Sequence, residues 1–171
     1  MSVHSWRIEH SWDGVPLSPS EHVFFALEAT SHVLRVRVDA PFYNDPPPGG
    51  PVGSLDGLWN HEVVELFVAG PVDEEGKIPY LEVELSPHGH FLVIQLHGIR
   101  QRQRVLESLL FDADIRGERW EGRADIPWEW LPPGPHRCNA YAIHGLPAQR
   151  IYSAMQPVPG EQPDFHRLQH F

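Results

Sequence analysis

Short runs of apolar residues, separated by turn-forming residues, recur along most of the chain. Residues 23–29 (VFFALEA) form one run, and in residues 32–40 (HVLRVRVDA) apolar and polar positions alternate with a period of two. This period is typical of a β-strand with one solvent-facing side. Further strands are expected at residues 61–70, 79–98 (two strands joined at SPHG), 120–130, 138–145 and 150–155, and less clearly at 99–105 and 109–115.

Helical spacing is nearly absent, so the expected fold is all-β with little helix. The 18 prolines also disfavour long helices. About nine or ten short strands predict an antiparallel β-sandwich, jelly-roll or immunoglobulin-like, or else an antiparallel barrel. We expect one domain spanning residues 1–171. The tail, residues 157–171, looks too polar and proline-rich for a core element, and the long loop at 40–57 is expected to shape a site or cover a sheet edge.

Composition narrows the classes of partner. The chain carries 23 acidic and 13 basic residues, a formal charge of −10, which argues against nucleic acids and anionic membranes as partners. A single cysteine, Cys138, excludes an internal disulfide and a cysteine-based zinc cluster. No signal peptide or membrane-spanning stretch is evident. We therefore expect a soluble cytoplasmic protein without a cofactor.

Two glutamates interrupt the most apolar strand, LWNHEVVELFVAG at residues 58–70. Burying an unpaired carboxylate costs several kcal/mol or forces it to take up a proton, so Glu62 and Glu65 need an explanation. Strand alternation places Trp59, Glu65 and Phe67 on one face and Glu62 on the other. We expect Glu62 to be held by backbone amides of the proline-rich loop or by an arginine.

The strand YLEVELSP places Tyr80, Glu82 and Glu84 on one face. If it neighbours the strand of Glu65, that carboxyl and one of Glu82 or Glu84 point into the same concavity. An aromatic ring beside acceptor carboxylates suits sugars, whose CH faces pack on the ring and whose hydroxyls donate to oxygen. The alternative is that these glutamates form ion pairs across the sheet, with candidate partners Arg35, Arg37 and Arg123.

Other motifs point less clearly to chemistry. HEVVE at 61–65 resembles the zinc-protease motif, but on a strand its ends lie roughly 13 Å apart, too far to chelate one ion. His88 and His90 form an HxH pair that can bind a metal, although turn histidines satisfied by backbone and water are favoured. No loop has the ligand spacing of a calcium site. The alternating arginines at 100, 102 and 104 are expected on a solvated edge strand rather than on phosphates.

Five motifs in order resemble the family-9-like carbohydrate-binding modules. They are LWNHEVVELFV, YLEVELSPHGH, WEGRADIPWEWL, CNAYAIHG and PDFHRLQHF, covering Leu58 to the C-terminus. The stretches IEHSWDG, APFYNDPP and QPVPG…PDFH are similar, more closely, to the uncharacterised chromosome-4 open-reading-frame-33 type family.

The resemblance implies a β-sandwich whose ligand lies between two aromatic rings. Trp59 matches one ring, Phe165 falls near the second, and Glu65 matches an acid that bonds sugar hydroxyls. Glu84 falls where the sugar-binding members have a basic contact, which reverses the charge. The expected ligand-binding residues are Trp59, Glu65, Glu82, Glu84, Tyr141, His144, Phe165 and His166.

Four functions remain open from the sequence. The first is a module that binds a sugar or polyol, and the second is a protein-interaction sandwich without a small ligand. The third is a small hydrolase using the pair Glu65 and Glu84, whose separation and access would decide it. The fourth is a metal site built from His88, His90 or His166 with a glutamate. We favour the binding module over an enzyme.

Overall fold

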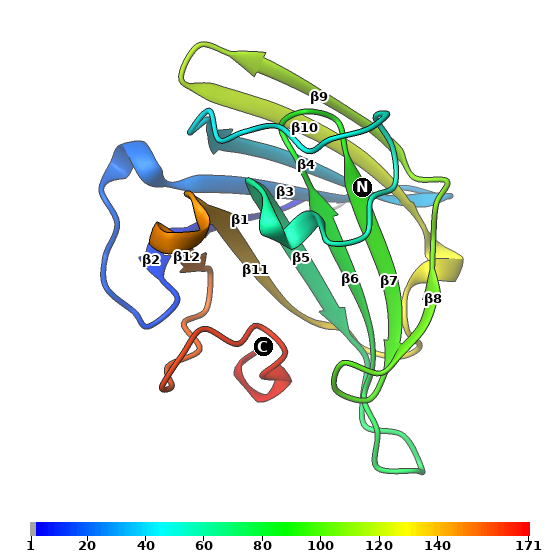
Figure 1. The fold of residues 1–171 in the computed structure, drawn as a ribbon. Coiled ribbons are helices and arrows are strands. Elements are labelled where there is room, and N and C mark those ends of the chain that lie inside the picture. Colours follow the sequence, from blue (N-terminus) through cyan, green and yellow to red (C-terminus); the bar gives the residue numbers. More distant parts are fainter. Residues whose placement is uncertain (1–2) are drawn as a thin grey trace.

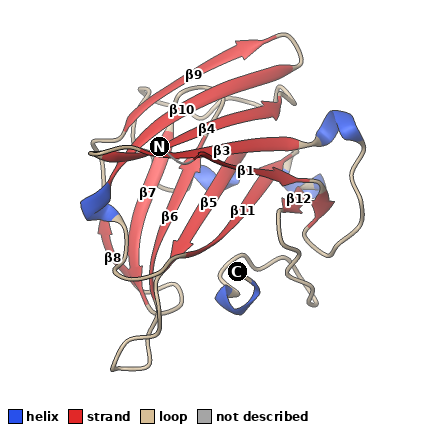
Figure 2. Cartoon of the chain, turned by 180° about the vertical axis from the view of Figure 1, so that it is seen from behind, coloured by secondary structure: helices blue, strands red, loops and turns tan. Residues whose placement is uncertain are grey.

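The computed structural model describes residues 3–171, which form two antiparallel sheets packed face to face (Figure 1). The smaller sheet has the order β1-β3-β4-β10-β9. Its strands are β1 (Val3–Ile8), β3 (Val23–Ala29), β4 (Val33–Pro41), β9 (Leu110–Arg116) and β10 (Arg119–Pro127). Seen from behind, these strands cross those of the other sheet at a steep angle (Figure 2).

The larger sheet has seven strands in the order β2-β12-β11-β5-β6-β7-β8. They are β2 (His10–Ser11), β5 (Val63–Ala69), β6 (Pro79–Leu85), β7 (Phe91–His97), β8 (Arg102–Val105), β11 (Arg137–His144) and β12 (Ile151–Ala154). Within residues 3–171 the helices are single 3₁₀ turns: η1 (Pro19–Glu21), η2 (Leu58–Asn60), η3 (Trp128–Trp130), η4 (Pro147–Gln149) and η5 (Leu168–His170). The predicted all-β sandwich is confirmed.

Most strands fall where the apolar runs predict them. The less clear candidates at 99–105 and 109–115 are the edge strands β8 and β9, and every residue of β8 is exposed. The N-terminal strand β1 was not predicted, because its residues show no strong alternation. None of the helices in residues 3–171 is long and apolar enough to span a membrane.

The main hydrophobic core fills the space between the sheets. Alternate residues of β5 and β6 point into it: Val64, Leu66, Val68, Leu81, Val83 and Leu85. From the smaller sheet, Trp120 supplies the largest fully buried side chain. Gly122 makes room for it, because a Cβ at this position would lie 2.7 Å from the Trp120 ring.

A second core lies on the outer face of the larger sheet. Here the C-terminal segment, residues 157–171, covers β5, β6 and β11. Its residues Val158, Phe165 and Leu168 are buried against the sheet. The expectation that the tail contributes no core element was therefore wrong, although its only regular element among the described residues is η5. Because both faces of β5 are covered, all seven of its residues are buried, which explains its nearly continuous apolar sequence.

Glu62 belongs to the inner side of the larger sheet, where the long loop 42–57 closes over the edge of the sandwich. Its carboxylate accepts hydrogen bonds from the backbone amides of Tyr43 (2.9 Å) and Asp45 (3.3 Å). Burial raises the pKa of Glu62 to about 6, and these two amides oppose the shift. The prediction that loop amides hold this glutamate is confirmed.

Candidate functional site

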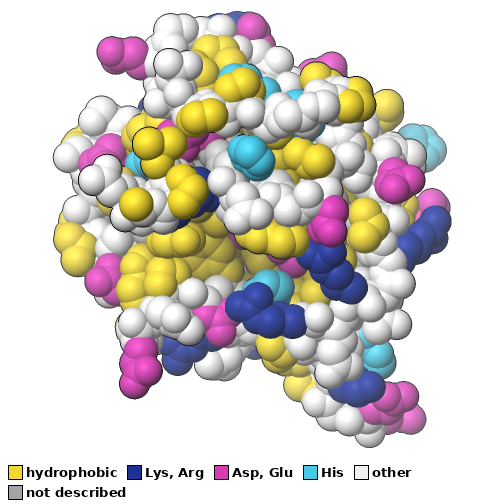
Figure 3. All heavy atoms as spheres, in the orientation of Figure 1, with side chains coloured by type: hydrophobic (Ala, Val, Ile, Leu, Met, Phe, Trp, Pro, Cys, Tyr) yellow, Lys and Arg dark blue, Asp and Glu magenta, His cyan; other side chains and the backbone are white. Residues whose placement is uncertain are grey.

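A cavity of about 250 Å³ opens on the outer face of the larger sheet, between η2, the β7–β8 connection and the C-terminal segment. In Figure 3, basic side chains lie beside a hollow with apolar walls on this face. The cavity is lined by Trp59, Glu65, Glu82, Leu96, Arg100, Arg102, Ile143, Tyr152, Pro163, Asp164, Phe165 and His166. The second core therefore does not cover this part of the sheet, and acidic side chains form the floor of the cavity.

The floor carboxyls come from two neighbouring strands. Glu65 of β5 lies directly opposite Glu84 of β6, and Glu82 lies opposite Phe67, so all three glutamates share the outer face. Glu65 and Glu82 line the cavity with exposed fractions of 3% and 6%. Glu84 is fully buried. The prediction that Glu65 and one of the β6 glutamates point into one concavity is confirmed.

The alternative, ion pairing with arginines of the other sheet, is wrong. Arg35 pairs with Asp125 at 2.7 Å, and Arg123 contacts the same carboxylate at 3.4 Å. Arg37 pairs with Glu28 at 3.7 Å. All of these residues lie in the smaller sheet, so none of the three arginines neutralises the floor of the cavity.

Burial dominates the electrostatics of the three floor glutamates. It raises the pKa of Glu65 and Glu84 well above the usual range, and the negative charges of neighbouring glutamates raise both further. The pKa of Glu82 is also raised by burial, while its contact with Glu84 opposes the shift. Burial therefore favours the protonated form of Glu84. Within residues 3–171, neither oxygen of Glu84 has a hydrogen-bond partner.

His166 forms one wall of the cavity as a neutral imidazole. Burial, followed by the charge of Arg100, lowers its pKa to about 4. The Tyr80 hydroxyl accepts a hydrogen bond from the Arg100 backbone amide (2.9 Å) and lies 2.7 Å from His166 Nδ1, so it donates to that nitrogen. This assigns the imidazole hydrogen to Nε2, which lies 4.0 Å from Glu82 Oε2. His166 can therefore donate to a ligand oxygen in the cavity.

Trp59 forms the opposite wall and sits on the short helix η2. The turn begins at Gly57, whose φ of 83° favours glycine. Arg150 fixes the turn from the other side by donating to the carbonyls of Trp59 (2.6 Å) and His61 (2.9 Å). The indole remains 37% exposed, and the Arg102 guanidinium lies 5.2 Å from the ring centre. A rigid turn thus presents a partly open aromatic platform at the mouth of the cavity.

Phe165 borders the cavity from the C-terminal segment and is held in place by β11. Its ring stacks on Tyr141 with centres 3.8 Å apart, and the Tyr141 hydroxyl donates to the Phe165 carbonyl at 3.2 Å. The buried Asn139 donates to the Tyr141 hydroxyl and to the Gln156 carbonyl, both at 2.9 Å. Tyr141 is fully buried and does not line the cavity, so it supports Phe165 from beneath.

Two arginines at the rim were not among the sequence-predicted site residues. Arg100 pairs with Asp164 of the C-terminal segment at 2.7 Å, and Arg102 pairs with Asp56 next to η2 at 2.8 Å. Their alternation predicted only a solvated edge strand, which is confirmed for Arg102 and Arg104 of β8. Arg100 instead lies in the turn between β7 and β8, with a φ of 57°. Their place at the cavity depends on where η2 and the tail dock, which the local pattern does not encode.

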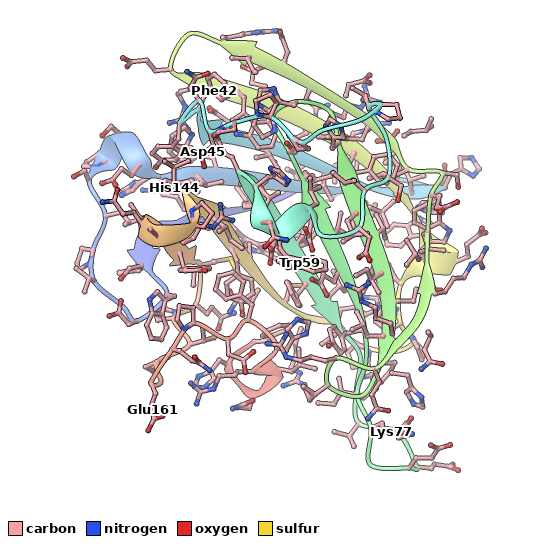
Figure 4. All side chains as sticks on the ribbon, viewed as in Figure 1. Phe42, Asp45, Trp59, Lys77, His144 and Glu161 are labelled. Carbon is pink, nitrogen blue, oxygen red and sulfur yellow. The ribbon has the colours of Figure 1, made fainter. Side chains whose placement is uncertain are left out.

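His144 does not line the cavity, contrary to expectation. Tyr141 and Ile143 face outward with the second core, so His144 has the opposite strand parity. It stacks on Tyr43 with ring centres 3.4 Å apart, at the edge where Gly145 donates to Asp45. Figure 4 shows His144 and Asp45 well separated from Trp59. The alternation along β11 could have revealed this.

The histidine pair at the β6–β7 turn forms no metal centre in the part of the chain that the structure describes, where no group of three suitable side chains could hold a metal ion. His90 is buried, and neither of its ring nitrogens has a hydrogen-bond partner within residues 3–171. His88 lies against the Phe42 ring, with centres 5.8 Å apart. The expectation that backbone groups satisfy the ring of His90 was therefore wrong for residues 3–171, whereas the expected water contacts of the two turn histidines stay a prediction.

Comparison with known proteins assigns the chain to a family. It is 41% identical to the mouse UPF0462 protein C4orf33 homologue, over 97% of this chain and 88% of the relative. The human UPF0462 protein C4orf33 is also 41% identical, over 97% of this chain and 85% of the relative. The chain belongs to the UPF0462 C4orf33 family. No family model matches the chain.

Solved structures show that this UPF0462 member shares its fold with carbohydrate-binding proteins. A candidate carbohydrate-binding protein from Bacteroides uniformis superposes with a TM-score of 0.72 at 15% identity, over 99% of this chain and 84% of the other. A family-9 carbohydrate-binding module from Caldicellulosiruptor kristjanssonii, solved in complex with glucose, superposes with a TM-score of 0.53 at 11% identity. The match covers 88% of this chain and 73% of the other. At these identities the similarity establishes the fold alone.

Proposed function

We propose that this protein binds a sugar or a similar polyol in the cavity above β5 and β6. The observation that carries the proposal is the convergence of Trp59, Glu65, Glu82 and His166 on one opening. The indole offers a flat apolar surface for the CH face of a ring, and the carboxyls and the imidazole can bond its hydroxyls. The single Cys138 thiol is consistent with our further proposal that this binding takes place in the cytoplasm.

The size of the opening supports a small ligand. Pockets for drug-sized molecules measure about 300–1,000 Å³. The cavity, at about 250 Å³, falls just below that range and suits a single sugar ring or the end of a longer chain. Because its own side chains leave this volume open, a small-molecule ligand is favoured over an interaction sandwich with a filled cleft.

The geometry does not favour the hydrolase alternative. A glycosidase pair needs both carboxyls in contact with the substrate, with a gap between them for the scissile bond. Glu65 and Glu84 lie directly opposite each other on adjacent strands, and Glu84 is fully buried. The second carboxyl that reaches the cavity is Glu82, beside the neutral His166. We therefore assign these groups to binding.

The proposal is tested by thermal unfolding against a panel of neutral and amino sugars at millimolar concentration. A ligand at 100 times its dissociation constant stabilises the fold by about 2.7 kcal/mol, which raises the Tm of a domain of this size by about 5–10 °C. We expect this shift to disappear in Trp59→Ala, which removes the platform.

The matched control is Trp128→Ala. Trp128 has the same exposed fraction as Trp59, 37%, but lies on η3, where its indole donates to the Thr30 carbonyl at 3.0 Å. This variant should keep the full ligand-induced shift. An absence of any shift with the whole panel, or a shift of unchanged size in Trp59→Ala, would contradict the proposed function.

A further inference from the structure

Within residues 3–171, no arginine or lysine forms an ion pair with the carboxyls on the cavity floor. Glu65 is 3% exposed and faces the opening, and it makes no hydrogen bond or ion pair with any residue of 3–171. Glu82 is 6% exposed, and its nearest basic group is His166, at 4.0 Å. Buried carboxyls are normally paired or hydrogen-bonded, so this arrangement leaves a partner to be supplied from outside.

The cations around the cavity are already engaged. Arg100 pairs with Asp164 and Arg102 with Asp56, each at less than 3 Å. The Arg150 guanidinium donates to three backbone carbonyls, those of Gly145, Trp59 and His61. His166 is neutral because burial lowers its pKa to about 4. Arg100 and Arg102 are therefore paired with other carboxylates, and Arg150, whose charge opposes the rise in the pKa of Glu65, is bonded to backbone carbonyls. Within residues 3–171, none of these arginines forms an ion pair with the carboxyls of the floor.

The walls of the cavity complete the chemical pattern. Trp59, Tyr152 and Phe165 surround the opening above the carboxyls. Aromatic faces attract ammonium groups through the ring quadrupole, most strongly for tryptophan. A hydroxyl can donate to a carboxyl, but it brings no charge to favour the ionised form of Glu65, which burial disfavours. An ammonium group supplies both the donors and the charge, and its hydrogen bonds to a carboxylate are roughly twice as strong as neutral ones.

We propose that the ligand is a sugar or polyol bearing a free primary amine, of the hexosamine class, with its ammonium group against Glu65 and Glu82. This inference rests on the proposed function, because it names the ligand class of the same cavity. The ring of the amino sugar packs on Trp59, and its remaining hydroxyls face His166. Acylation of the amine removes the charge that would pair with the carboxyls.

The test is isothermal titration at pH 7 with glucosamine, N-acetylglucosamine and glucose. These ligands share one ring and differ at a single position, which carries an ammonium, an amide or a hydroxyl group. We expect glucosamine to bind at least tenfold more tightly than either of the others, roughly the effect of one charge-assisted hydrogen bond in place of a neutral one. If glucose or N-acetylglucosamine binds as tightly as glucosamine, the amine inference is overturned while the proposed function stands. If none of the three sugars binds, the amine inference and the proposed function both fail for this sugar class.

Glu65→Gln keeps the shape of the floor and removes the carboxyl that a bound ammonium group would hold in its ionised form. The ratio of glucosamine to glucose affinity should fall toward one in this variant. Glu107→Gln changes the net charge equally at an exposed loop position and should keep the wild-type ratio. A ratio that is the same in Glu65→Gln as in the wild type would refute the assignment of the ammonium group to this carboxyl.

Discussion

Replacing Glu84 by glutamine should flatten the pH dependence of stability. Glu84 is fully buried and has no donor to either oxygen within residues 3–171, and burial raises its pKa well above the usual range. We expect the folded protein to keep this proton at pH 6–7, whereas the unfolded chain, with an ordinary carboxyl pKa, has released it. The folded state binds more protons, so the free energy of unfolding falls as the pH rises through this window.

The size of the effect follows from the proton count. One proton held only by the folded state changes the free energy of unfolding by about 1.4 kcal/mol per pH unit. Glutamine is neutral in both states and removes this contribution. Between pH 6 and pH 7 the wild type should thus lose about 1.4 kcal/mol more than Glu84→Gln, equivalent to about 3–6 °C in Tm for a domain of this size.

Urea denaturation at pH 6 and pH 7, followed by tryptophan fluorescence, measures this difference. His166 and His144 have pKa values lowered by burial and act in the opposite direction, but they are present in both proteins and cancel in the comparison. Glu107→Gln, at an exposed position, should follow the wild type. If the curves of Glu84→Gln and wild type run parallel from pH 6 to pH 7, Glu84 does not hold the extra proton.

Two further substitutions test the packing that shapes the site. Gly122→Ala should destabilise the fold by about 1–3 kcal/mol through overpacking, because the new methyl group would lie 2.7 Å from the buried Trp120 ring. Gly49→Ala meets no atom within 4 Å and serves as the control; equal urea midpoints for the two variants would refute this account. Asn139→Ala removes the donor to the Tyr141 hydroxyl and should cost about 1–3 kcal/mol while weakening ligand binding, since Tyr141 supports Phe165. Unchanged stability and ligand affinity, measured by urea denaturation and titration, would show that Asn139 does not anchor the C-terminal segment.

The placement of the acidic floor could be predicted from the sequence. Alternation with a period of two put Glu65 and Glu82 on one face and Glu62 on the other, and the structure has them there. The prediction succeeded because successive side chains of a strand point to opposite faces. This alternation follows from the local backbone geometry and needs no knowledge of distant residues. The same rule, applied along β11, would have excluded His144 from the cavity.

The closure of the site could not be predicted in this way. Arg100, Arg102 and Asp164 reach the rim only because η2 and the C-terminal segment dock onto the outer face of the larger sheet. That docking buries Val158 and Leu168, although the composition of the segment is typical of a polar tail. The sequence by itself therefore determined the strands, the faces of their side chains and the acidic character of the floor. Only the tertiary structure decided that the second core leaves a cavity over these carboxyls, because packing between distant segments depends on contacts that no local pattern encodes.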